Sequence, residues 1–390
     1  MFKIQTLNKI DTEGLSLFPL DNYEIASEMP RPDSIILRSF NMHEMEFPST
    51  LKAVARAGAG VNNIPIEKCT EKGIVVFNTP GANANGVKEL VIAGLLLASR
   101  DITDGVAWAK TLAGKGEEVA PLIEKGKKNF AGQEIQGKTL AVVGLGAIGV
   151  LVANAAHSLG MNVIGYDPYM SVKQALKLSN QVKFVNGIQP LLSQADYVTL
   201  NIPLTPETKN YINKEKFGMM KNNVRILNFA RGGLVDLDAL GVAIESGKVA
   251  RYVTDFPNEK TLTMKNVIAI PHLGASTNES ETNCAIMAVN QLKDFLEDGN
   301  IKNSVNFPEA QMERNGGARI LIANQNIPNM VSQISSVLAS EGLNIDNMLN
   351  KKHENIAYNI IDVARASINP EIKTKLEAIK GVIMVRIIQS

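Results

Sequence analysis

The chain has 390 residues, of which 45% are hydrophobic and 20% charged, a composition that excludes disorder and is typical of two or three globular domains. The 40 basic and 39 acidic side chains nearly cancel, so nothing predicts a nucleic-acid partner. The most apolar run, Leu90 to Ala98, is less than half the roughly 20 residues that a membrane span needs. Two distant cysteines, Cys69 and Cys284, favour free buried thiols in a reducing cytoplasm.

The first part of the chain alternates short apolar strands with turn and helix signals. Strands are predicted at Ser34 to Leu37, Leu51 to Ala55 and Gly73 to Phe77. A long helical stretch then runs from Val87 to about Lys110. This pattern indicates a small open α/β domain.

A second pattern begins at Lys138, where a strand (Thr139 to Val143) leads through a glycine-rich turn into a helix that ends near Gly160. Further apolar runs of the parallel-strand type follow. They are Met161 to Tyr166, Ala195 to Ile202, Val224 to Phe229 and Val267 to Ile270. The order predicts a doubly wound nucleotide-binding domain. A helix from Glu279 to about Leu296 would then return the chain to the first domain.

The glycine-rich turn has the spacing of a dinucleotide site. Gly144 permits a sharp turn, Gly146 removes a side chain where the backbone must approach a pyrophosphate, and Gly149 permits close packing of helix on sheet. Asp167, about 18 residues after Gly149, ends the next strand, where a carboxylate can bind a ribose 2′-hydroxyl. Because that charge would repel a 2′-phosphate, we expect NAD rather than NADP.

Two polar side chains follow later strands at the same predicted edge of the sheet. Arg231 stands next to Gly232 and Gly233, and its planar fork suits a substrate carboxylate. His272 leads into a loop of small residues, and an imidazole can accept a hydroxyl proton as hydride leaves the neighbouring carbon. Together they indicate a hydride-transfer enzyme that acts on a hydroxy or keto acid.

The last 75 residues or so, beyond Asn315 to Gly317, restart as an independent unit. Strands at Ile320 to Ala323, Asn344 to Leu349, Ile356 to Val363 and Val382 to Ile388 alternate with two striped helices. The predicted order is βαββαβ.

These motifs resemble those of the D-isomer-specific 2-hydroxyacid dehydrogenases, and the resemblance spans the whole chain. Besides the glycine turn and the runs at Arg231 and His272, it rests on the segments Ala55 to Asn63, Phe77 to Pro80, Val87 to Leu90, Gly137 to Leu140 and Pro203 to Thr208. It implies an α/β fold in three parts. A doubly wound parallel-sheet NAD domain (99–282) is inserted in a smaller flavodoxin-like substrate domain (1–98 and 283–308). A ferredoxin-like, ACT-type regulatory domain (316–390) follows.

The resemblance also implies site residues. Arg231, Glu259 and His272 would form the catalytic set, although the segment from Asp255 to Lys260 is one position shorter than the family pattern. The cofactor set would be Gly144, Gly146, Ala147, Ile148, Gly149, Asp167, Pro203, Phe229, Ala230, Asp255, His272, Gly274 and Ala275. The substrate set would be Arg38, Arg56, Gly58, Asn83 and Arg231, with no metal.

The implied reaction is NAD-dependent oxidation of D-3-phosphoglycerate to 3-phosphohydroxypyruvate, the first step towards L-serine, in a homodimer or homotetramer. In the ACT-type domain, Asn324, Asn326 and Asn344 would contact L-serine as an inhibitor across a two-fold interface. Three alternatives stay open. The substrate is another 2-hydroxy or 2-oxo acid, such as 2-oxoglutarate; the third domain only assembles subunits; or the chain is a non-catalytic NAD-sensing co-repressor.

Overall fold

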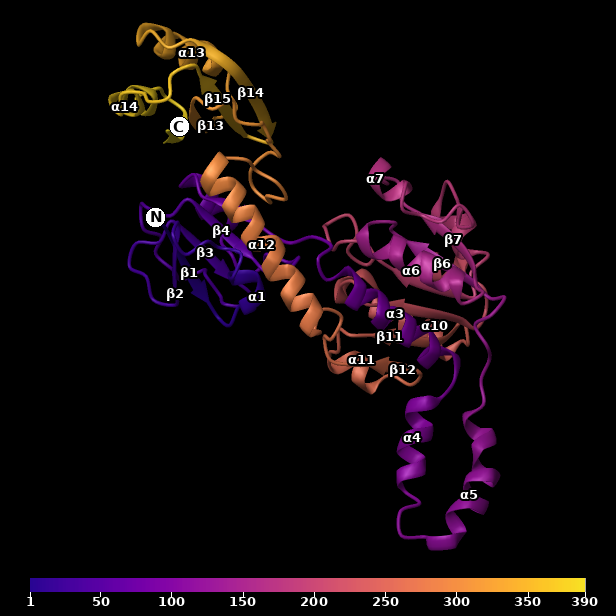
Figure 1. The fold of residues 1–390 in the computed structure, drawn as a ribbon. Coiled ribbons are helices and arrows are strands. Elements are labelled where there is room, and N and C mark those ends of the chain that lie inside the picture. Colours follow the sequence, from indigo (N-terminus) through magenta and orange to yellow (C-terminus); the bar gives the residue numbers. More distant parts are fainter. Residues whose placement is uncertain (390) are drawn as a thin grey trace. The chain divides into compact units, whose positions relative to one another are not determined.

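The computed structural model describes residues 1–389 and divides into two compact units (Figure 1). One unit joins Met1–Ala82 to the chain from Glu281 onward, and the other is Asn83–Ser280. The middle of the chain is therefore inserted within the first unit, and the predicted α/β class is confirmed.

The first unit begins with five parallel strands in the order β2-β1-β3-β4-β5, which is the flavodoxin-like order. The strands are β1 (Phe2–Leu7), β2 (Tyr23–Ala26), β3 (Ser34–Leu37), β4 (Ala53–Arg56) and β5 (Val75–Phe77). All of β3 and β5 is buried, as in a parallel sheet covered on both faces. The accompanying helices are α1 (Thr12–Leu15), α2 (Ile66–Glu71) and α12 (Asn278–Asp298), of which α12 enters this unit at Glu281.

The C-terminal part of the same unit is an antiparallel sheet in the order β14-β15-β13-β16. Its elements are β13 (Ala318–Gln325), α13 (Met330–Ser340), β14 (Ile345–His353), β15 (Ile356–Val363), α14 (Glu371–Glu377) and β16 (Val382–Ile388). The predicted βαββαβ order is confirmed.

Both faces of the C-terminal sheet are covered by this chain. Ile320 and Ile361 belong to the core that includes α13 and α14. Leu321 and Tyr358 belong instead to the core of the first sheet, together with Phe295 of α12. The C-terminal sheet is therefore packed into the first unit.

The second unit contains seven strands in the order β12-β11-β10-β9-β6-β7-β8. They are β6 (Thr139–Val143), β7 (Asn162–Tyr166), β8 (Lys183–Phe184), β9 (Tyr197–Leu200), β10 (Val224–Asn228), β11 (Val249–Thr254) and β12 (Val267–Ala269), all parallel. The order reverses between β6 and β9, which is the switch point where doubly wound folds bind ligands.

The helices of this unit are α3 (Ala84–Ser99), α4 (Ile102–Lys110), α5 (Val119–Gly126), α6 (Ala147–Ser158), α7 (Val172–Ala175), α8 (Ile188–Leu192), α9 (Lys214–Met219), α10 (Leu237–Glu245) and α11 (Glu259–Thr263), with short 3-10 turns η1 (Gly116–Glu118), η2 (Lys127–Phe130) and η3 (Gly232–Leu234). The helix predicted from Val87 to Lys110 is broken, because Arg100 is extended. Its first half, α3, packs on α6, β10 and β11 of this unit, although the sequence prediction placed residues 83–98 in the substrate domain.

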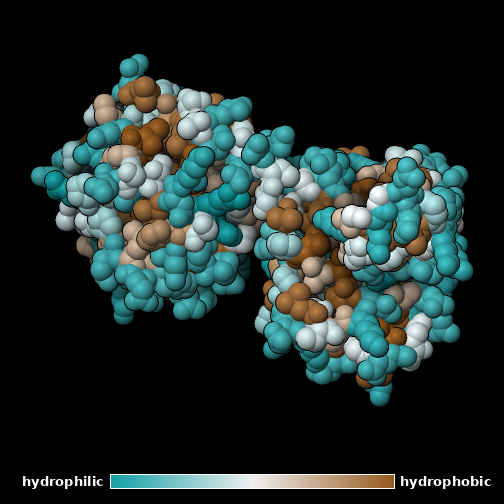
Figure 2. Space-filling model, turned by 90° about the horizontal axis from the view of Figure 1, so that it is seen from below, coloured by the Kyte–Doolittle hydropathy of each residue, from teal (hydrophilic) through white to brown (hydrophobic). Residues whose placement is uncertain are grey.

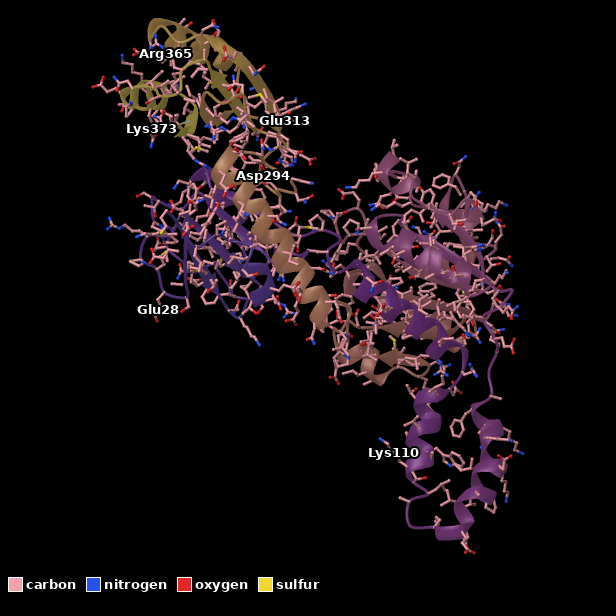
Figure 3. The ribbon with its side chains drawn as sticks, viewed as in Figure 1. Glu28, Lys110, Asp294, Glu313, Arg365 and Lys373 are labelled. Atoms are coloured by element: carbon pink, nitrogen blue, oxygen red, sulfur yellow. The ribbon has the colours of Figure 1, made fainter. Side chains whose placement is uncertain are left out.

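The segment from α4 to η2 forms a helical arm that protrudes from the seven-stranded sheet (Figure 1). Trp108 packs on Phe130 with ring centroids 5.2 Å apart. A Cβ at Gly126 would lie 2.4 Å from the Trp108 ring, so the arm needs glycine there. Lys110 lies on the outside of the arm (Figure 3). The sequence analysis did not predict the second half of this arm.

Hydrophilic residues dominate the face shown in Figure 2, with hydrophobic residues scattered among them. Among the described residues, no helix combines the length and apolar character needed to cross a bilayer. Both cysteines are free and buried as predicted, and burial raises the pKa of the Cys69 thiol to about 12.

Candidate active site

The glycine turn after β6 has the geometry of a dinucleotide cradle. Gly144 adopts φ +89°, and a Cβ there would lie 2.6 Å from the carbonyl oxygen of Asn201. A Cβ at Gly149 would lie 1.9 Å from the carbonyl oxygen of Gly144, which fixes the close approach of α6. A Cβ at Gly146 would meet no atom within 4 Å, so its position faces open space at the start of α6. The N-terminus of α6 can therefore receive a pyrophosphate.

Asp167 directly follows β7 and lies beside this turn. Its Oδ2 accepts a hydrogen bond of 2.8 Å from the backbone N–H of Leu145, and its Oδ1 accepts one from Tyr169. The carboxylate is thus held at the edge of the cradle, where a ribose hydroxyl can reach it. These residues fit NAD.

Five strands end at the same edge, because they are parallel neighbours. Gly144, Pro203, Arg231, Asp255 and His272 follow β6, β9, β10, β11 and β12 respectively. Neighbouring strands lie about 4.8 Å apart, so these residues form a row along the carboxyl edge. The other predicted cofactor residues of this unit, Ala147, Ile148, Phe229, Ala230, Gly274 and Ala275, lie on the segments that follow β6, β10 and β12.

Asp255 is fully buried at this edge. Its Oδ2 accepts a hydrogen bond of 3.2 Å from the N–H of Gly274, and its Oδ1 has no partner among the described residues. Burial raises the pKa of Asp255, while the charges of His272 and Arg231 act in the opposite direction. The His272 ring lies 4.7 Å from the ring of Phe256. The structure therefore brings Asp255, His272 and Arg231 into one electrostatic environment.

Arg231 is held by a residue that the sequence analysis missed. The side chain of buried Asn228, the last residue of β10, donates 2.9 Å to the carbonyl of Arg231 and accepts from the N–H of Ala230. A polar residue at the end of a mostly apolar strand was the available signal. The Arg231 guanidinium is exposed and donates to the carbonyl of Ala230 at 2.7 Å.

Glu259 stands apart from this group. It is the exposed first residue of α11, where Asn258 and Thr261 form a capping box. Within residues 1–389, the Glu259 side chain makes no hydrogen bond or ion pair, and the carboxylate whose charge interacts with His272 is that of Asp255. After the shortened segment that follows β11, the glutamate lies at the N-terminus of a helix. There the positive end of the helix dipole stabilises its negative charge.

Three residues of the predicted substrate set, Arg38, Arg56 and Gly58, lie in the first unit. Arg56, at the end of β4, donates 2.8 Å to the carbonyl of Arg38, and a Cβ at Gly58 would rest 3.6 Å from the Arg56 guanidinium. Arg38 forms an ion pair of 2.6 Å with Glu281, a partner that the sequence analysis missed. Asn83, the remaining substrate residue, precedes α3 in the second unit.

The three asparagines predicted to be regulatory do not come together within one chain. Asn324 is buried and accepts 2.8 Å from Asn359, and Asn326 follows β13 near Glu354. Asn344 precedes β14, whose first residue pairs with Val363 at the other end of β15. Eight strand residues, roughly 25 Å, separate the two ends.

Residues 92–274 match the family model of the D-isomer specific 2-hydroxyacid dehydrogenase NAD binding domain. D-3-phosphoglycerate dehydrogenase of Haemophilus influenzae is 31% identical over 95% of this chain and 90% of its own length. The enzyme of that name from Methanocaldococcus jannaschii is 37% identical over 81% of this chain, which spans 60% of that relative. The chain covers only about half to three-fifths of the length of several such relatives.

The structure of NAD+-bound 3-phosphoglycerate dehydrogenase from Entamoeba histolytica matches with a TM-score of 0.61 and 26% identity, over 78% of this chain and 98% of that one. This chain belongs to the D-isomer-specific 2-hydroxyacid dehydrogenase family, and its second unit is an NAD-binding domain. The resemblance and the cofactor predicted from the sequence are confirmed.

Proposed function

We propose that the chain oxidises D-3-phosphoglycerate to 3-phosphohydroxypyruvate with NAD. The observation that most strongly supports this is the row of Arg231, Asp255 and His272 at the carboxyl edge of the sheet that holds the glycine turn. The names of the relatives from Haemophilus influenzae and Methanocaldococcus jannaschii support the same substrate.

His272 and Arg231 divide the work on the substrate. Bound NAD supplies the hydride acceptor, so C2 of the hydroxy acid loses a hydride while its hydroxyl loses a proton. His272 accepts that proton at a ring nitrogen, and the exposed Arg231 fork binds the carboxylate through two parallel hydrogen bonds. Buried Asp255 favours the imidazolium that forms. Glu259 stays a predicted member of the catalytic set, and in this proposal it reaches the imidazole only after the segment that follows β11 rearranges.

In this proposal the phosphate binds to Arg38, Arg56 and the backbone near Gly58. Arg38 must exchange its partner Glu281 for the phosphate, which is an inexpensive exchange because both side chains are about two-fifths exposed. Asn83 would complete the substrate set.

The test is NADH formation from D-3-phosphoglycerate, D-lactate and D-2-hydroxyglutarate. We expect the phosphorylated substrate to give the highest kcat/KM, and His272→Ala to lower kcat by about 10²- to 10⁴-fold. His353→Ala removes an exposed histidine and should leave kcat unchanged. Preference for D-2-hydroxyglutarate would favour the alternative dehydrogenase, and turnover of no hydroxy acid would favour the NAD-sensing co-repressor.

We further propose that L-serine binds the C-terminal domain of a cytoplasmic homo-oligomer and inhibits it. Asn326 and Asn344 lie at opposite ends of the sheet, so one serine could contact both only if they came from two chains. Serine should therefore lower the initial rate in wild type, and Asn326→Ala should relieve this inhibition. A flat rate with serine would leave the domain as an assembly module.

A further inference from the structure

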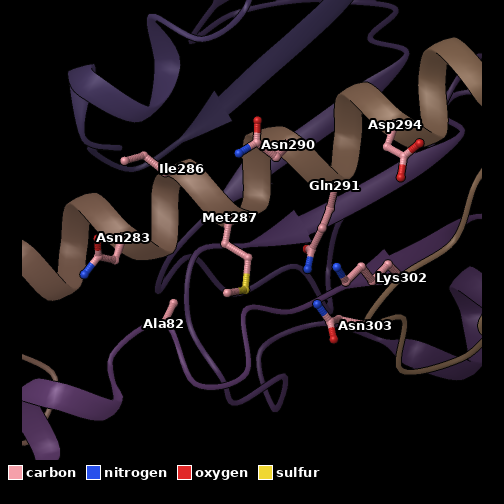
Figure 4. A pocket seen from close by; sticks show the side chains of 9 residues that line it. All are labelled: Ala82, Asn283, Ile286, Met287, Asn290, Gln291, Asp294, Lys302 and Asn303. Carbon is pink, nitrogen blue, oxygen red and sulfur yellow. The ribbon is translucent and has the colours of Figure 1, made fainter. Parts of the chain in front are cut away.

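A cavity of about 470 Å³ lies beside α12 in the first unit (Figure 4). No residue of the predicted catalytic, cofactor, substrate or regulatory sets lines it. The volume falls in the range of small-molecule sites. Its wall includes a stripe of α12, with Asn283, Met287, Asn290 and Asp294 at helical spacing.

Gln291 lines this cavity, and its carboxamide is buried without a hydrogen-bond partner among the described residues. Its side chain is only 6% exposed, and neither Nε2 nor Oε1 has a hydrogen-bond partner among the described residues. Figure 4 shows it extending from α12 towards Lys302 and Asn303. A buried carboxamide without hydrogen bonds is costly, and it can be satisfied by a ligand that both donates and accepts.

One cationic and one anionic side chain, those of Lys302 and Asp294, line the cavity. Lys302 is exposed and forms no ion pair within residues 1–389. Asp294 accepts 2.8 Å from Asn300 through Oδ1 and is not paired with Lys302. A simple anion would meet the Asp294 carboxylate, and a simple cation would meet the Lys302 ammonium. A molecule that carries both a negative and a positive group can pair with the Lys302 ammonium and the Asp294 carboxylate at the same time.

We propose that this cavity binds a small α-amino acid as a zwitterion. Its carboxylate faces Lys302 and the Nε2 of Gln291, and its ammonium faces Asp294 and the Oε1 of Gln291. Its side chain lies towards Met287 and Ala82, which supply apolar surface. The proposal is independent of the reaction and of the serine site assigned to the C-terminal sheet.

Isothermal titration of the full chain with glycine, L-alanine and L-serine tests the proposal. At least one should bind, whereas acetate and methylamine, which each carry one of the two charges, should bind about tenfold more weakly or not at all. Lys302→Met and Gln291→Leu should each weaken binding by about tenfold. Lys9→Met, which removes an exposed lysine outside the cavity, should not change it.

Lys302 is exposed, so Lys302→Met should fold even if Gln291→Leu does not. Failure of all three amino acids to bind at about 10 mM would overturn the proposal. Acetate binding as tightly as an amino acid would overturn it in favour of an anion site. Binding lost in Asn326→Ala but intact in Lys302→Met would place the amino acid on the C-terminal sheet instead.

Discussion

At the scale of the residue, the ionised carboxylate of Asp255 destabilises the folded state because it is buried away from water. Its carboxylate is fully buried, one oxygen has no partner among the described residues, and burial raises its pKa. The folded state therefore holds the proton more tightly than the unfolded chain does. The resulting stability is complete below the unfolded pKa of about 3.9 and is lost as pH rises through the folded pKa.

Asp255→Asn should consequently gain stability relative to wild type as pH rises from 4 to 8. The amide cannot ionise, and its oxygen can still accept from Gly274. We expect the difference in Tm between variant and wild type to grow by about 2 to 4 °C over this range, measured by differential scanning calorimetry. Asp104→Asn, which changes an exposed carboxylate of the arm, should show no such pH dependence. A Tm difference between variant and wild type that stays constant from pH 4 to 8 would contradict this assignment.

At the scale of the element, the C-terminal sheet adds side-chain hydrogen bonds to the end of α12, beside the backbone bond of 2.9 Å from the N–H of Gly299 to the carbonyl of Phe295. Arg319 donates 2.9 Å to the carbonyl of Asp298, Arg386 donates 2.9 Å to that of Phe295, and Tyr358 donates 2.8 Å to that of Gly299. Helix ends leave carbonyls unsatisfied, and cations are favoured there. Side chains from β13, β15 and β16 thus act together as a C-terminal cap.

Arg319 is the central member of this cap. It is fully buried, and all five of its N–H groups donate, two of them to the buried carboxylate of Asp362 at 2.6 and 2.9 Å. Arg319→Met should lower the free energy of unfolding by about 3 to 5 kcal/mol, because it leaves Asp362 buried and unpaired. Urea titration measures this. Arg319→Met with Asp362→Leu should recover part of the loss, and an equal or larger loss in the double variant would contradict the account.

The sequence predicted most helices and strands, but not the ion pairs that join side chains far apart in the chain. Apolar runs and the glycine spacing located β6, β7, β10 and the row at their carboxyl ends, since these are local patterns. The Arg319–Asp362 pair and the Arg38–Glu281 pair join residues far apart in the chain, so no local pattern reveals them. The break between α3 and α4 was missed because helical propensity continues through Arg100, where the chain is extended. The catalytic role predicted for Glu259 rested on the spacing of the family pattern, and the segment from Asp255 to Lys260 is shorter than that pattern.

At the scale of the molecule, the first unit shares one core between its parallel sheet and the C-terminal sheet. Ile4, Phe295 and Phe307 belong to the same buried cluster as Leu321 and Tyr358. A chain that ends at Arg314 would expose that cluster and lose the cap of α12.

We therefore expect residues 1–314 to unfold at a lower Tm than the full chain and to aggregate, because large apolar patches on a monomer promote association. Size-exclusion chromatography with light scattering would measure this. The full chain at the same concentration is the control. A monodisperse truncated chain with an unchanged Tm would show that the two sheets are energetically separate.

Because side chains of the C-terminal sheet cap α12, this sheet cannot simply be exchanged for the C-terminal domain of another protein. A replacement C-terminal domain would need more than a matching apolar face: it would have to bring two guanidiniums and a phenol to the positions of Arg319, Arg386 and Tyr358. The helix already ends at a left-handed glycine, Gly299 with φ +74°, so a glycine stop does not replace the three groups. Chimaeras built at the Asn315–Gly317 junction should succeed only when the donor carries them.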